Sequence, residues 1–256
     1  MKHLLRLSYL GTRYFGFQVQ PKGETIQAAL QCAAEKIFSS PCTVTGCSRT
    51  DSGVHANEYL AVVENIGHSS ISEAAIPRAM NTYLPADIAV QKSVVVSDDF
   101  SIRRHVQGKE YMYLIWNHPV RNPFYQDRAL SYFRPIQQEK ISEVLPYFIG
   151  KHDFRAFMAS GSDVIDTVRT ITDLRVEKDG NFVKIFVSAD GFLYNMVRII
   201  VGTLLEVSEG KISPKQLKEA IDGGTRDAVG RTASAQGLYL NRVFLDETYF
   251  DEESAL

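Results

Sequence analysis

The sequence predicts an α+β fold with a largely antiparallel sheet, and two observations lead to this prediction. First, runs typical of strands and runs typical of helices are mixed along the 256 residues, without the regular alternation that builds a parallel sheet. Second, the mixture comes in two rounds, each with strands and at least two helices. We therefore expect two similar halves, residues 1–105 and residues 106–256.

In the first round, a helix is expected over 25–38, because Thr25 can cap its start and the apolar residues after it recur at helical spacing. A second helix is expected over 72–84, where Pro77 fits the first turns. Alternating or β-branched runs predict the strands. These strands cover 3–12, 42–47, 58–66 and 86–96.

In the second round, an alternating run over 109–117 predicts a strand. Residues 168–190 predict a hairpin that turns at Asp179 and Gly180. Pro146 should bend or shorten the first of three expected helices, because proline disrupts the interior of a helix. These helices cover 139–150, 193–207 and 213–222.

Composition excludes several classes of protein. With 45% hydrophobic and 23% charged residues the chain is neither disordered nor fibrous in character. The longest apolar stretch, from Met196 to Val207, contains Arg198 and is shorter than the roughly 20 residues that cross a bilayer. The start of the chain has no signal-peptide pattern. We therefore expect a cytoplasmic protein that does not enter a membrane.

The net charge of −2 does not indicate a nucleic-acid binder, but the charges are unevenly distributed. Six basic residues and two acids lie between residues 101 and 134. The basic residues are Arg103, Arg104, Lys109, Arg121, Arg128 and Arg134. Such a run could turn a positive face toward a polyanion, or it could be an ordinary solvated surface.

The segment "TGCSRTDSGVHA" lies between two expected strands and contains Asp51. In an extended backbone Arg49 and Asp51 would face the same side, and the guanidinium would hold the carboxylate ionised and oriented. An ionised, oriented carboxylate suits a nucleophile or a general base. The same residues, with Gly53, also fit an ordinary turn, so both interpretations stay open.

The segment "GKEYMY" places Lys109, Tyr111 and Tyr113 on one face of a strand. A tyrosine beside cations can stack on an unpaired base. The alternative is that both tyrosines are amphipathic sheet residues, and for Tyr113 we favour that alternative.

Arg198 interrupts an otherwise apolar helix. A buried arginine needs a partner, because an unpaired buried charge is costly. Asp51 is one candidate for a carboxylate partner, and Asp190 and Glu206 are others.

Eight segments, taken together, carry a resemblance to a known family. They are "LGTRYFGFQVQP", "TIQAAL", "SRTDSGVHA", "MNTYLPADIAV", "KEYMY", "GKHDFRAF", "GFLYNMVRIIVGTLLEVSEGKI" and "TASAQGLYLNRV". In this order, and over nearly the whole chain, they resemble the tRNA pseudouridine synthase A family.

The resemblance implies an enzyme that converts uridines of the tRNA anticodon stem-loop, at positions 38 to 40, into pseudouridine without a metal or an organic cofactor. Asp51 matches the catalytic aspartate of that family and Tyr111 its active-site tyrosine. Arg49 and Arg198 match arginines near that aspartate.

The resemblance also implies an architecture and partners. The two similar α+β halves would share a continuous, largely antiparallel sheet with helices on one side and a catalytic cleft between the halves. The enzyme would be a homodimer that binds tRNA, with Arg103, Arg104 and Lys109 on the RNA phosphates.

The chain departs from the family pattern at a few positions. Ser48 stands where the motif usually has a glycine, and Ser52 where it has an alanine. A divergent member with another RNA target, or a tRNA-binding module without turnover, therefore remain as alternatives. A sugar hydrolase using Asp51 is less well supported, because a second carboxylate at a matched spacing is not evident.

Overall fold

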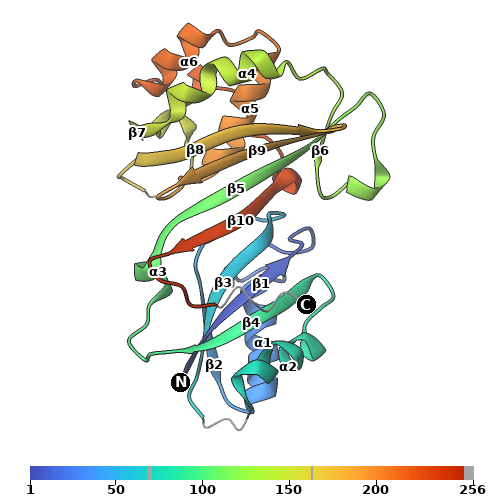
Figure 1. Ribbon diagram of the computed structural model, residues 1–256, viewed down its shortest axis with the longest axis vertical. Helices are drawn as coiled ribbons and strands as arrows, with labels where there is room; N and C mark the ends of the chain where they lie inside the picture. The colour runs from blue at the N-terminus through green and yellow to red at the C-terminus, as the bar shows by residue number, and fades with distance from the viewer. Residues whose placement is uncertain (68–70, 163, 251–256) are drawn as a thin grey trace. The chain divides into compact units, whose positions relative to one another are not determined.

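The structure is a computed structural model that describes residues 1–67, 71–162 and 164–250. The chain forms two compact units, each an α+β assembly with a largely antiparallel sheet (Figure 1). This confirms the predicted fold class. No helix within these described ranges is long and apolar enough to cross a membrane.

Unit 1 comprises Met1–Gln107 and Leu240–Leu256. Its strands follow the order β4-β1-β3-β10, with β2 paired to β3. The pairs formed by β1 with β3, β1 with β4 and β2 with β3 are antiparallel. The strand bounds are β1 (Lys2–Tyr9), β2 (Cys42–Gly46), β3 (His55–Asn65), β4 (Ile88–Val96) and β10 (Leu238–Leu245).

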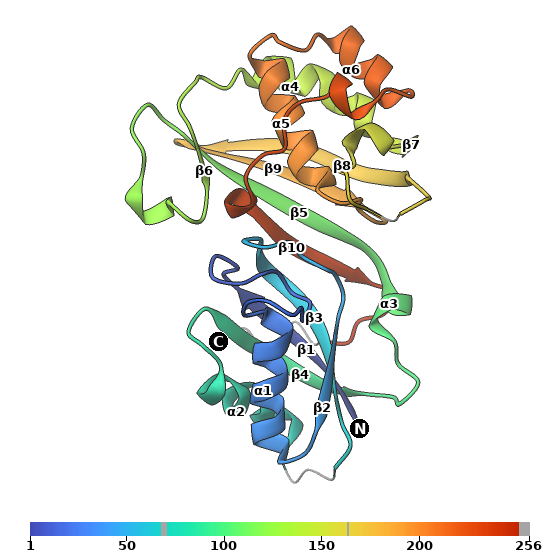
Figure 2. The ribbon, with the colours of Figure 1, turned by 180° about the vertical axis from the view of Figure 1, so that it is seen from behind.

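Two helices of unit 1, α1 (Ile26–Phe38) and α2 (Ile76–Tyr83), lie on one face of this sheet, as Figures 1 and 2 show from opposite sides. Thr25 caps α1 through its side chain, which accepts the N–H of Ala28, and Pro77 lies in the first turn of α2. The apolar face of α1 is buried, as its periodicity predicts. A short helix, α3 (Ile102–His105), precedes the second unit.

Unit 2 comprises Gly108–Tyr239. Its strands follow the order β5-β9-β8-β7, antiparallel throughout, and β6 pairs with β5 in parallel. The strand bounds are β5 (Val106–Asn117), β6 (Leu130–Tyr132), β7 (Gly150–Asp153), β8 (Val168–Asp179) and β9 (Phe182–Ala189). The hairpin of β8 and β9 turns at Gly180, with a φ of 58°, as predicted.

Three helices cover one face of the unit 2 sheet: α4 (Gln138–Val144), α5 (Met196–Ser208) and α6 (Pro214–Ile221) (Figure 1). Almost every residue of α5 is buried, so this helix forms the centre of the unit 2 core. The helix α4 is shortened, as expected at Pro146, and continues as a 3-10 turn over Leu145–Phe148.

The sequence patterns missed three strands, β6, β7 and β10. The division between the units also differs from a single boundary at residue 105, because the chain returns to unit 1 at Leu240. There, the N–H of Val243 donates to Glu58 at 2.9 Å and Asp246 pairs with His105 at 2.9 Å. These contacts join segments more than 140 residues apart in sequence, which local patterns do not encode.

Candidate active site

Asp51 lies on an irregular turn that joins β2 to β3 in unit 1. Its own carbonyl accepts the N–H of Val54 at 3.2 Å, and Gly53 completes the turn with a φ of 77°. The preceding Thr50 is buried, with its Oγ1 2.8 Å from the hydroxyl of Tyr9. The turn interpretation of the backbone is therefore confirmed, and this turn leaves the Asp51 residue only partly buried.

The segment of residues 10–24, between β1 and α1, anchors this turn from outside. The N–H of Phe17 donates to the Thr50 carbonyl at 3.1 Å, and the Tyr14 carbonyl accepts the N–H of Gly53 at 3.3 Å. Gly16 has a φ of 84°, and a Cβ there would lie 2.5 Å from the Thr50 carbonyl oxygen. Only glycine allows the two backbones to approach so closely in this conformation. The position of Asp51 therefore depends on this segment.

Tyr14 also belongs to a charged cluster that fixes the same segment. Its hydroxyl donates to Asp87 at 2.6 Å, and Nε of Arg13 donates to the other carboxylate oxygen at 2.7 Å. Burial and the bond to Asp87 raise the pKa of Tyr14 to about 12, so its hydroxyl keeps its proton. Sequence reasoning assigned no role to these residues, since Asp87 is remote from Tyr14 along the chain.

Two other residues of the motif have structural roles. His55 is fully buried, and its Nδ1 accepts the N–H of Gly11 at 2.9 Å, which requires a ring nitrogen without a proton. Ser52, which departs from the family pattern, donates its hydroxyl to the Tyr14 carbonyl at 3.2 Å. Its side chain therefore reinforces the turn.

The expected ion pair between Arg49 and Asp51 does not form. Arg49 is exposed and makes no hydrogen bond or ion pair with any residue that the structure describes. The physical reason is that residues 48–51 lie beyond the end of β2 and outside any strand, so the alternation of side-chain faces in a sheet does not apply to them.

Tyr111 lies in β5 of unit 2, where it pairs with Val187 of β9. It is 7% exposed, and its ring meets the ring of Phe192 edge to face, with 4.9 Å between the centroids. Tyr113 is fully buried and donates its hydroxyl to the Ser234 carbonyl at 2.8 Å. The preference for a structural Tyr113 is therefore confirmed.

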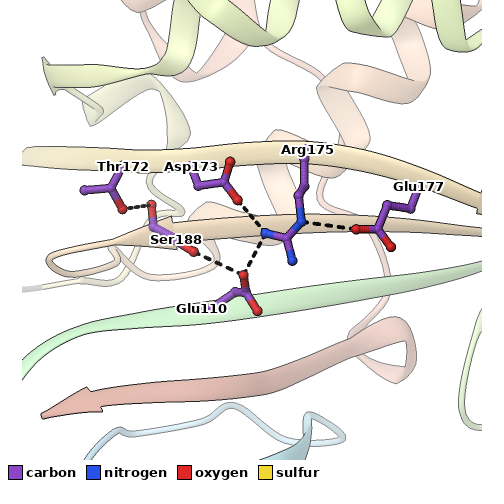
Figure 3. A network of polar contacts seen from close by, with 6 residues as sticks. All are labelled: Glu110, Thr172, Asp173, Arg175, Glu177 and Ser188. Atoms are coloured by element: carbon purple, nitrogen blue, oxygen red, sulfur yellow. Dashed lines mark hydrogen bonds and ion pairs between the residues drawn. The ribbon is translucent and has the colours of Figure 1, made fainter.

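Glu110 precedes Tyr111 in β5, and its side chain lies on the opposite face of the strand. There it belongs to a charge network (Figure 3). Glu110 is 6% exposed and accepts hydrogen bonds from Arg175 at 2.8 Å and from Ser188 at 3.3 Å. Arg175 also binds Asp173 and Glu177, and its guanidinium lies 4.0 Å from the ring centroid of Phe186. The network ties together β5, β9 and β8 and so stabilises the strand that carries Tyr111.

Arg198 lies in the first turn of α5, also in unit 2. Its Nε donates to the carbonyl of Ala233 at 2.7 Å and its Nη1 to Oδ1 of Asn195 at 2.6 Å. Neither of these two acceptors carries a charge. A cation at the start of a helix is also unfavourable to the helix dipole. The two hydrogen bonds fix the orientation of the guanidinium at the start of α5.

The two carboxylates considered as alternative partners of Arg198 have partners of their own. Asp190 accepts the backbone N–H of Thr170 at 2.9 Å, and Glu206 accepts that of Arg231 at 3.2 Å.

The residues expected to bind RNA phosphates divide between the units. Arg103 and Arg104 are exposed on α3 in unit 1, and Arg104 donates to the Asp99 carbonyl at 2.7 Å. Lys109 is half-buried in β5 of unit 2. Across residues 1–67, 71–162 and 164–250, no three His, Cys, Asp or Glu side chains come together as a group that could hold a metal ion.

The partly buried aspartate on the anchored turn of unit 1 is a group suited to nucleophilic chemistry. Unit 2 by itself holds an oriented arginine, Arg198, and a buried tyrosine, Tyr111. A family model described as tRNA pseudouridine synthase matches residues 7–103 and 145–246. These two segments include Asp51 and Arg198, whereas Tyr111 and Lys109 lie between them.

Curated relatives cover nearly the whole chain. "tRNA pseudouridine synthase A 2" of Clostridium perfringens is 44% identical over 94% of this chain and 98% of its own. "tRNA pseudouridine synthase A" is 41% identical in both Acetivibrio thermocellus and Bacillus licheniformis, over 94% and 96% of this chain and 98% and 100% of theirs. Among solved structures, a chain of a Cbf5-Nop10-Gar1 complex has a TM-score of 0.42 at 15% identity, covering 94% of this chain and 59% of its own, a likeness too distant to bear on function.

The chain belongs to the tRNA pseudouridine synthase family. It is accordingly an RNA pseudouridine synthase, an isomerase.

Proposed function

We propose that the protein converts uridine to pseudouridine in the anticodon stem-loop of tRNA, at positions 38 to 40, with Asp51 as the nucleophile. The observation that carries this proposal is the anchored turn, which holds Asp51 in one backbone conformation through hydrogen bonds to Thr50 and Gly53. A nucleophile held in place loses less freedom when the substrate binds. The names of the relatives support tRNA as the substrate.

In the proposed reaction the Asp51 carboxylate attacks C1′ of the ribose or C6 of the uracil, and the N-glycosidic bond breaks. The uracil turns and forms a new bond from C5 to C1′. A carboxylate bonded to C1′ leaves C1′ as this bond forms, whereas a carboxylate bonded to C6 leaves C6 afterwards. The proton on C5 then leaves and N1 gains a proton. Atoms and electrons therefore balance without an oxidant or a reductant.

Tyr111, Arg198 and Arg49 have proposed roles around this step. Tyr111 stacks on the target base and assists removal of the C5 proton. Arg198 stabilises the ionised Asp51, the role that the family resemblance implies, and the Ala233 carbonyl and Oδ1 of Asn195 help to orient its guanidinium. Arg49, which is exposed, contacts the RNA near the nucleophile.

Substrate binding completes the proposal. The target uridine leaves its stack to reach Asp51, as in other enzymes that act on bases. Arg103, Arg104 and Lys109 bind phosphates, the protein acts as a homodimer, and it works in the cytoplasm. A different RNA target is the alternative that the departures at Ser48 and Ser52 suggest.

The test is the Asp51→Asn variant. We expect its rate of pseudouridine formation on tRNA transcripts to fall at least about 10³-fold, because the nucleophile is lost. Its affinity for tRNA should change by less than about twofold, since one half-exposed carboxylate contributes little to binding RNA. Chemical mapping of pseudouridine and filter binding measure the two quantities. Asp98→Asn, on an exposed side chain of the same unit, is the control.

Three outcomes are decisive. Substantial turnover by Asp51→Asn would remove Asp51 as nucleophile. A wild-type protein that binds tRNA without forming pseudouridine would favour the non-catalytic binding module. Pseudouridine mapped outside positions 38 to 40, in RNA from cells with and without the gene, would favour the different target.

A further inference from the structure

Residues 118–129, between β5 and β6 of unit 2, present an aromatic side chain to solvent that has no role in the proposed reaction. We call this segment the arm. Figures 1 and 2 show that it extends from the end of the sheet on the side away from α4, α5 and α6. Phe124 is 76% exposed and Val120 is 64% exposed. The arm also lies outside both segments that the family model matches.

The exposure of Phe124 does not result from a loose loop. Phe124 belongs to a 3-10 turn, Pro123–Tyr125, and its N–H donates to the side chain of Asn122 at 3.1 Å. The neighbouring Tyr125 packs edge to face on Phe182 of β9, with 4.7 Å between the centroids. The arm is therefore anchored to the sheet through Tyr125 while Phe124 remains outside.

The far side of the arm is anchored as well. The hydroxyl of Tyr239 donates to the Arg128 carbonyl at 2.6 Å, and the side chain of Gln236 donates to the Gln126 carbonyl at 3.0 Å. An aromatic ring held rigidly in water gives up little conformational freedom when a partner covers it.

The charged residues of the arm indicate which kind of partner would cover Phe124. Arg121 is exposed and makes no hydrogen bond or ion pair within the described part of the chain. The guanidinium of Arg128 lies 5.3 Å from the Tyr125 ring centroid and also binds the Phe124 carbonyl. Arg134, just beyond the arm, pairs with Glu209, and Asp127 is the one acid of the arm. An exposed ring and exposed arginines on the same short segment match an unpaired base and a neighbouring phosphate.

We propose that the arm is a binding site for unpaired nucleotides of the RNA substrate: Phe124 stacks on a base and Arg121 contacts a backbone phosphate. This inference rests on the proposed function, since it takes RNA as the substrate. A second copy of the chain fits less well, because an apolar interface excludes charge from its centre, whereas Arg121 and Arg128 flank Phe124.

The test compares Phe124→Ala with a matched variant. Base stacking on an aromatic side chain predicts that Phe124→Ala weakens binding of an unmodified tRNA transcript by about tenfold. Ile165→Ala is the control, because Ile165 is an apolar side chain of the same unit that is 97% exposed and lies outside the arm. Its affinity should stay within about twofold of wild type. Thermal melting should be unchanged for both variants, since both side chains lie in solvent.

The role of Arg121 has its own measurement. Arg121→Ala should reduce the slope of log affinity against log salt by about one unit, the signature of one lost phosphate contact. Ultraviolet crosslinking of the wild-type complex should attach an RNA base within the arm.

Two results would overturn the inference. One is a Phe124→Ala protein that binds the transcript as tightly as wild type and Ile165→Ala. The other is a Phe124→Ala protein whose mass in solution is halved, which would assign the arm to an interface between copies. A wild-type protein that binds the transcript but makes no pseudouridine would refute the proposed function alone, and the binding comparison would still decide the role of the arm.

Discussion

Asp51 and Tyr111 are held in place in different ways. Asp51 lies on an irregular turn whose backbone is anchored by a few hydrogen bonds from the segment of residues 10–24. Tyr111 lies in the middle of β5, which pairs with β9 over eight consecutive positions. The strand position rests on many equivalent bonds, whereas the turn rests on a few contacts and on the close approach of Gly16 to Thr50.

Because of this difference, we expect substitutions near Asp51 to affect mainly activity and substitutions near Tyr111 to affect mainly stability. A small change beside the turn displaces Asp51 while the sheet of unit 1 remains intact. A change beside Tyr111 is shared among three strands and affects the stability of unit 2 before it moves the ring.

The largest effect is expected from Gly16→Ala. The new Cβ would lie 2.5 Å from the Thr50 carbonyl oxygen, so the backbones must separate. A displacement of about 1 Å at a reacting group can lower the rate about 10²-fold, and we expect a loss of this size in pseudouridine formation. The positive φ of 84° adds a stability cost of about 1 to 3 kcal/mol. Single-turnover kinetics and urea unfolding measure the two effects.

Gly161→Ala is the matched control for Gly16→Ala. Gly161 has a φ of 87°, but nothing lies within 4 Å of a Cβ placed there. The control should lose stability through backbone strain and keep its activity. Equal losses of activity in the two variants would contradict the idea that contact with the turn is what matters.

A smaller effect is expected from Glu110→Gln, on the Tyr111 side. Glu110 is buried, but Arg175 is 39% exposed at its side chain, so solvent screens the ion pair. We expect the free energy of unfolding to fall by about 1 to 2 kcal/mol, with the rate of pseudouridine formation within about threefold of wild type. Glu177→Gln, at an exposed carboxylate of the same network, should cost less than about 0.5 kcal/mol. A large loss of activity with unchanged stability would show that Glu110 acts on the reaction itself.

The smallest effect concerns pH. His3 is buried in unit 1, its ring stacks on Phe38 at 5.3 Å, and neither ring nitrogen has a hydrogen-bond partner among the described residues. Burial lowers the pKa of His3 below 6.5, an effect that Glu73 partly opposes. The unfolded chain then binds the proton more readily than the folded one, so the stability contributed above pH 6.5 is lost as the pH falls below it.

His3→Phe keeps the stacked ring and removes the titration. Between pH 7.5 and 5.5 its stability should therefore fall less than that of wild type, as measured by urea unfolding. Identical pH dependence in the two proteins would show that His3 is not the group responsible.

Local patterns predicted the regular elements well, because their periods depend only on neighbours. Thr25 marked the start of α1, Pro146 the shortening of α4, and Gly180 the turn of the β8–β9 hairpin, and all three are observed. The strand β10 was missed, because what makes it part of unit 1 is its contact with Glu58, far away in sequence.

In the candidate site, too, local patterns did not predict contacts between segments that are distant in sequence. The motif around Asp51 indicated a turn and a carboxylate, but the alternation rule failed for Arg49, because residues 48–51 lie outside any strand. The cluster of Tyr14, Asp87 and Arg13 has no local signal, since 73 positions separate Tyr14 from Asp87.

The sequence by itself determined the α+β class, most helices and strands, and the family. The helices and strands follow from the spacing of neighbouring residues, and the family follows from the motifs and their order along the chain. Only the tertiary structure decided how the Asp51 turn is anchored, that Ala233 and Asn195 accept hydrogen bonds from Arg198, and that Phe124 is exposed to solvent on an anchored arm. Those features depend on backbone approach and on burial, and both arise only when distant segments pack together.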